Sequence, residues 1–98
     1  MTIEKKQEGN NLTVCLEGRL DTLTSPELEA EFRQSLTGIT ELVVDMEKLA
    51  YISSAGLRVL LSAQKVMNKQ GAMRIRNVSE EIMEIFEVTG FVDILTIE

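Results

Sequence analysis

Residues 45–61 read DMEKLAYISSAGLRVLL, a pattern that indicates a strand, a turn and the start of an apolar helix. Ser53 and Ser54 fall where this helix begins, and Gly56 follows closely. The free backbone amides and the dipole at the start of a helix favour negative charge. A serine hydroxyl at this point could cap the helix, act as a nucleophile or accept a phosphate. The choice among these three roles largely determines the function.

The segments on either side of this turn predict an α/β fold. Alternating or continuous apolar residues, bounded by turn residues, indicate strands, and apolar residues three or four apart indicate helices. The expected strands cover residues 3–7, 12–17, 41–46, 72–76 and 92–97. The first expected helix begins with Ser25 as its N-cap and Pro26 at its first position, and it ends before Gly38. The second runs from Ser54 to about Asn68. The third begins with Ser79 as its N-cap and ends before Gly90.

Strands that alternate with helices imply a mostly parallel sheet with right-handed crossovers, and the first two strands suit an antiparallel hairpin. We therefore expect a mixed sheet of four to five strands flanked by helices, in a single domain over residues 1–98. The β-branched run at 41–46 suits a central strand covered on both faces, and residues 47–49 are expected to turn. The second helix has a wide apolar arc, which is either core or a surface for a partner, and its pattern favours the core.

Composition excludes several classes of function. The chain carries 16 acidic and 10 basic residues, a net charge of −6, with one cysteine and no histidine. The absence of a basic patch argues against nucleic acid. Without histidine, neither a Ser-His-Asp triad nor a common zinc site can form, and Cys15, expected to be buried, has no disulfide partner. No apolar run approaches the roughly 20 residues that cross a bilayer, so we expect a cytoplasmic protein without membrane, metal or cofactor.

The same reasoning narrows the role of the two serines. A nucleophilic serine needs a base beside it, and nothing in the sequence indicates that Lys48 or Lys65 has the lowered pKa that this role requires. The glycine-rich patterns of nucleophile elbows and phosphate-binding loops are also absent. We therefore expect no enzymatic activity. A cap accounts for one serine, whereas the run of small residues leaves the turn open to a partner. The remaining hypothesis is that Ser54 accepts a regulatory phosphate.

Three stretches carry a family resemblance: GRLDTLTSPEL at 18–28, ELVVDMEKLAYISSAGLRVLL at 41–61 and GAMRIRNVSEEIMEIFEVTGFVDIL at 71–95. In order and spacing they resemble the STAS-domain anti-sigma factor antagonists of bacteria. The resemblance implies a binding switch. The unphosphorylated protein would bind an anti-sigma factor that is also a serine kinase, and so release a sigma factor. The kinase would phosphorylate a serine at the start of the second helix, and a PP2C-type phosphatase would reverse the reaction.

The resemblance also implies site residues. Alignment on Gly56 and Leu57 places the phosphoserine at Ser54, with Ser53 as a rival because it occupies the position where the best-studied switches carry aspartate. Arg19 stands where an acidic residue is common. The expected partner-binding residues are Asp21, Thr24, Ser53, Ser54, Ala55, Gly56, Leu57 and Arg58. The alternative is an interaction module that is not phosphorylated and belongs to a larger assembly, either stressosome-like or associated with a transporter.

Overall fold

The computed structural model describes residues 1–98 and contains four strands and three α-helices. The strands are β1 (Thr2–Glu8), β2 (Asn11–Leu20), β3 (Glu41–Ile52) and β4 (Ala72–Arg76). The helices are α1 (Ser25–Ser35), α2 (Ser54–Gln70) and α3 (Glu80–Thr89), followed by a short 3₁₀ helix, η1 (Phe91–Asp93). None of the helices is long and apolar enough to cross a membrane.

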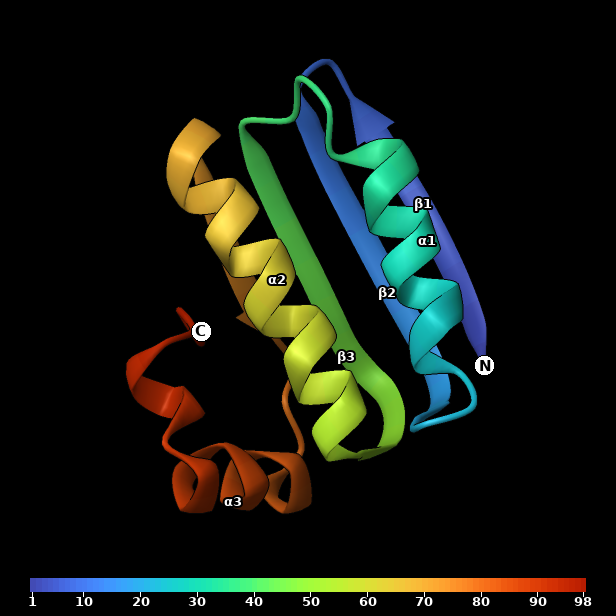
Figure 1. Cartoon of the computed structure of the whole chain (residues 1–98), viewed down its shortest axis with the longest axis vertical. Helices are drawn as coiled ribbons and strands as arrows, with labels where there is room; N and C mark the ends of the chain where they lie inside the picture. Colours follow the sequence, from blue (N-terminus) through green and yellow to red (C-terminus); the bar gives the residue numbers. More distant parts are fainter.

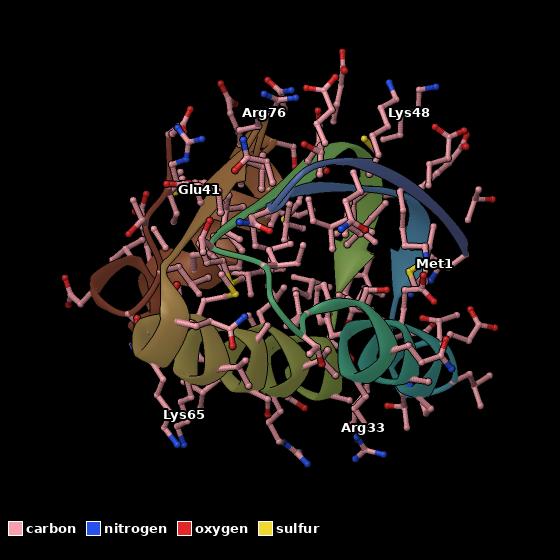
Figure 2. All side chains as sticks on the ribbon, turned by 90° about the horizontal axis from the view of Figure 1, so that it is seen from above. Met1, Arg33, Glu41, Lys48, Lys65 and Arg76 are labelled. Atoms are coloured by element: carbon pink, nitrogen blue, oxygen red, sulfur yellow. The ribbon has the colours of Figure 1, made fainter.

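The sheet has the strand order β1-β2-β3-β4, with β1 antiparallel to β2 and the other pairs parallel. This confirms the predicted mixed sheet with an initial hairpin. Helices α1 and α2 cover one face, and α3 lies at the end of the molecule where α2 begins (Figure 1). Side chains on the other face, such as Lys48 and Arg76, point away from the helices (Figure 2).

Helices thus cover β3 on one face only, so the expectation of two covered faces is wrong. Val43 on the open face is nevertheless only 7% exposed. Cys15, expected to be buried, is half-buried on this face.

The core is one cluster of 23 buried apolar residues between the sheet and its helices. The strands contribute alternate residues, among them Leu12, Val14 and Leu16 of β2. Most of the wide apolar arc of α2 belongs to this cluster, but Leu61 is half-buried outside it and Val66 has 41% of its surface exposed. The arc is therefore mainly core, as its pattern suggested.

Strand β3 does not turn at residues 47–49, contrary to the prediction, but continues with two irregularities. Its register against β2 shifts between the pairs Cys15–Asp45 and Glu17–Lys48, and shifts again between Gly18–Leu49 and Arg19–Tyr51. Each shift inserts one extra residue into β3, as a β-bulge does. The side-chain alternation is reset twice, so Leu49 and Ile52 both reach the core although they are three residues apart.

Two predicted boundaries are also corrected. The N-cap of α1 is Thr24 and not Ser25, whose buried hydroxyl donates a hydrogen bond to the carbonyl oxygen of Asp21. The expected last strand over 92–97 is reduced to a single bridge, in which Ile97 pairs in parallel with Ile75. The residues before this bridge include the 3₁₀ turn η1.

Candidate functional site

The predicted site residues come together because β2 and β3 are parallel and end at the same edge of the sheet. Leu20 and Ile52 are paired at the ends of these strands. The backbone N–H of Ser53 donates to the carbonyl oxygen of Leu20 over 2.9 Å, which fastens the start of α2 to the end of β2. We call residues 21–24 and 53–58 the serine edge. Ligand sites of open α/β sheets commonly form outside such carboxyl ends.

The two serines differ in their surroundings. Ser53 is the N-cap of α2, and its half-buried hydroxyl accepts a hydrogen bond of 3.4 Å from the backbone N–H of Gly56. Ser54 is the first residue of the helix and is exposed. The first turn of α2 contains no acidic residue, so the helix itself supplies no carboxylate to offset the positive end of its dipole. A negative group on Ser54 would meet a favourable potential from the helix itself.

Gly56 is required by close packing. A Cβ atom at this position would lie 2.8 Å from Cγ of Leu20 and 2.9 Å from Cγ1 of Ile52. Leu57 is also buried, with 5% of its surface exposed. These two predicted partner-binding residues therefore position the helix and do not present side chains at the surface. Ala55 is half-buried and Arg58 is exposed, so both remain accessible on the serine edge.

Asp21 organises the loop on the other side of the edge. Its Oδ1 accepts hydrogen bonds from the backbone N–H groups of Leu23 (3.0 Å) and Thr24 (3.1 Å) and from the Thr24 hydroxyl. The Thr24 hydroxyl also lies 2.7 Å from the carbonyl oxygen of Arg19, to which it can donate. The backbone N–H of Thr24 is the main cause that lowers the pKa of Asp21 below its usual value, with further help from Leu23 and Arg19. The loop is therefore fixed by an ionised carboxylate.

Leu23 of this loop and the nearby Tyr51 were not predicted as site residues, and Arg19 was noted only because it stands where an acidic residue is common. The side chain of Leu23 is held outward at the loop tip with 86% of its surface exposed. The guanidinium carbon of Arg19 lies 4.4 Å from the centre of the Tyr51 ring, and its Nε lies 3.7 Å from Oδ2 of Asp21. Exposed tyrosine and arginine side chains are enriched at protein contacts, and an exposed leucine adds apolar surface beside them. A leucine within the polar loop DTLT was the signal available in the sequence.

The chemistry of the edge is that of binding. It offers a free hydroxyl at the positive end of a helix, an ionised loop carboxylate and exposed side chains on a rigid support. Neither Lys48 nor Lys65 lies among its residues. The fold and this edge define a small α/β interaction domain.

The chain belongs to the STAS domain family, whose model matches residues 2–98. BtrV of Bordetella bronchiseptica is 36% identical over 88 residues, which cover 88% of this chain and 76% of BtrV. The anti-sigma-B factor antagonist of Staphylococcus aureus is 31% identical over 99 residues, which cover 97% of this chain and 90% of that protein. The fold matches that of the Bacillus cell fate determinant SpoIIAA in its phosphorylated form, with a TM-score of 0.77, 16% identity and coverage of 99% and 91%.

These comparisons confirm the predicted family and fold. Anti-sigma factor antagonists are regulatory proteins without enzymatic activity, and the expectation that this chain is not an enzyme agrees with its membership.

Proposed function

We propose that this protein is an anti-sigma factor antagonist whose serine edge binds an anti-sigma factor, and that phosphorylation of Ser54 breaks this complex. The observation that carries the proposal is the exposed hydroxyl of Ser54 at the first position of α2. The contact surface would comprise the accessible residues of the edge, namely Asp21, Thr24, Ser53, Ser54, Ala55 and Arg58, with Gly56 and Leu57 supporting them from below.

The hydrogen bonds favour Ser54 over Ser53 as the acceptor. Ser53 uses its hydroxyl oxygen to accept the N–H of Gly56, and phosphorylation there would disturb the cap. Ser54 makes no such bond and is exposed. A kinase can therefore reach Ser54 without opening the helix.

The physical basis of the switch is the added charge. A phosphoserine carries about −1.5 to −2 charges near pH 7, which the positive end of α2 tolerates. The fold is therefore retained, while a docked partner faces a bulky anion at the centre of the contact. A loss of about 1.4 kcal/mol in binding free energy lowers affinity tenfold. A loss of a few kcal/mol is therefore enough to dissociate the complex.

The proposal is tested by incubating the protein with its cognate anti-sigma factor kinase and ATP and locating phosphate by mass spectrometry. We expect one phosphate on Ser54, none on the Ser54→Ala variant, and removal by a PP2C-type phosphatase. Phosphate on neither Ser53 nor Ser54, with binding to the anti-sigma factor retained, would favour the interaction module that is not phosphorylated.

A second experiment isolates the charge mechanism. The variant Ser54→Asp should keep the circular dichroism spectrum of the wild type and lose binding to the anti-sigma factor in calorimetry. Ser62→Asp is the matched control, because Ser62 is also an exposed serine of α2 but lies about 12 Å further along the helix axis. Undiminished binding of Ser54→Asp would refute the mechanism.

A further inference from the structure

The excess negative charge of this protein is confined to its C-terminal part. Residues 78–98 contain six acidic residues and no basic one, so the other residues hold ten of each and are neutral. The net charge of −6 therefore belongs to α3 and the segment after it. Of the six carboxylates only Glu98 has an ion pair, with 2.9 Å between its Oε1 and Nη1 of Arg74. The unpaired carboxylates are Glu80, Glu81, Glu84, Glu87 and Asp93.

Exposed apolar side chains gather in the same segment. Of the six large hydrophobic residues exposed in the whole protein, three lie within residues 88–94: Val88 (81% exposed), Val92 (36%) and Ile94 (44%). A shallow hollow of about 260 Å³ lies on the side of α3 away from the core. Its lining defines the outer face of α3: Glu81, Glu84, Ile85, Val88 and Thr89.

Carboxylates and one of these exposed apolar residues, Val88, share one face of α3. The lining residues recur at the three- and four-residue spacing of one side of a helix, while Ile82 and Phe86 on the opposite side are fully buried. The outer face thus has an apolar centre, where the exposed Val88 lies next to Ile85, which is half-buried and also packs against the core, with carboxylates beside it. Exposed apolar patches rimmed by polar groups commonly mark protein contacts.

Glu80 and Glu81 lie in the first turn of α3, where the helix dipole favours negative charge, but the later carboxylates do not stabilise the helix in this way. Glu87 lies in the second half of α3, where the helix dipole favours cations, and the last turn of this helix has no basic residue. Glu80 and Glu84 are four residues apart, a spacing at which like charges repel. A cationic partner on the outer face would relieve the repulsion at Glu84.

We propose that the outer face of α3 is a second docking surface, which binds a protein segment that combines apolar side chains with flanking lysine or arginine. The apolar centre would receive the apolar side chains, and Glu81 and Glu84 would pair with the cations. The same charge repels nucleic acids and anionic membranes, which excludes them as occupants. The outer face shares no residue with the serine edge, so the proposal does not depend on phosphorylation of Ser54.

Three labelled peptides of equal length test the proposal by fluorescence anisotropy. The first has leucines at helical spacing with lysines between them, the second replaces each lysine by glutamate, and the third replaces each leucine by serine. We expect the first peptide to bind, and the other two to bind at least tenfold more weakly. Equal binding of the first and third peptides would overturn the proposal, because attraction by charge alone would explain it. No binding of the first peptide would overturn it as well.

Matched variants locate the contact. Glu84→Lys should weaken the first peptide at least tenfold while the unfolding temperature stays the same or rises, because it replaces repulsion by Glu80 with attraction. Glu8→Lys makes the same charge change on an exposed residue of β1 that has no ion pair, and should weaken binding less than twofold. Equal losses in the two variants would show that only net charge matters and would overturn the proposal.

Val88→Ser should weaken the first peptide at least fivefold. Val66→Ser removes an exposed valine from the groove between α1 and α2 and should have no effect. The reverse result would place the peptide in that groove and refute the assignment to α3.

Discussion

Replacing Gly56 by alanine tests the packing that places the serine edge. The added Cβ would approach Cγ of Leu20 to 2.8 Å, Cγ1 of Ile52 to 2.9 Å and the carbonyl oxygen of Leu20 to 3.0 Å. All three contacts are closer than ordinary van der Waals contact, and one of them is with backbone. The carbonyl of Leu20 cannot move freely, because it accepts the 2.9 Å hydrogen bond from Ser53. We therefore expect Gly56→Ala to push α2 away from β2.

The magnitude follows from two opposing effects. Overpacking a core typically costs about 1–3 kcal/mol. Alanine is favoured over glycine by up to about 1 kcal/mol inside a helix, and Gly56 lies in the first turn, where this gain is smaller. The net loss in the free energy of unfolding is therefore about 1–2 kcal/mol. For a domain of this size that loss lowers the unfolding temperature by about 5–15 °C.

Urea unfolding followed by circular dichroism measures this loss, and a double-mutant cycle assigns its cause. Leu20→Ala alone should cost about 2–5 kcal/mol, because Leu20 is fully buried. It also removes the Cγ atom that Gly56→Ala would strike. The double variant should therefore lose less free energy of unfolding than the sum of the losses of the two single variants. A Gly56→Ala protein as stable as the wild type, or strictly additive losses, would refute the steric argument.

Three further outcomes are expected. Ser53→Ala should lower the free energy of unfolding by about 1 kcal/mol in urea titrations, through loss of the cap, whereas Ser54→Ala should change it by less than about 0.5 kcal/mol. Burial raises the pKa of Asp45, but the N–H of Glu47 and its other hydrogen-bond partners outweigh it and hold the pKa below the usual value. The ionised Asp45 therefore stabilises the fold above about pH 4, and this stabilisation is lost as the pH falls through the lower pKa of the folded state. The urea midpoint of unfolding should then fall less steeply below about pH 4 in Asp45→Asn than in the wild type. Leu23→Ser should weaken anti-sigma factor binding roughly tenfold at unchanged stability, and equal binding would refute its role.

The sequence predicted those parts of the fold that depend on local pattern. The glycine after α3 adopts the left-handed conformation expected of a C-terminal cap, with φ of 81° at Gly90, and Ser79 caps the same helix, as predicted. The parallel sheet followed from the alternation of strands and helices. Because parallel strands end at one edge, the same topology brought Asp21 and Ser54 to one side of the molecule.

The errors arose where pairing between distant segments overrides local pattern. The bulges in β3 break the alternation of apolar residues, and such a break is indistinguishable from a turn until the partner strand is known. Residues 92–97 have the composition of a strand, yet only Ile97 finds a partner, next to Ile75 at the sheet edge. The contact between Arg19 and Tyr51 depends on the second bulge, and the sequence of neither strand specifies it alone.

The run of small residues at the start of α2 has two causes, which the sequence cannot separate. The sequence suggested that these residues are small in order to let a partner approach the turn. The structure assigns Gly56 to internal packing, since Leu20 and Ile52 leave no space for a side chain. Ser53 is occupied as a cap. Only Ser54 and Ala55 remain to be explained by a partner. Close approach by a kinase or an anti-sigma factor therefore requires small residues only at these two positions. A bulky substitution at Ala55 should reduce binding to the anti-sigma factor without the loss of stability expected for Gly56→Ala.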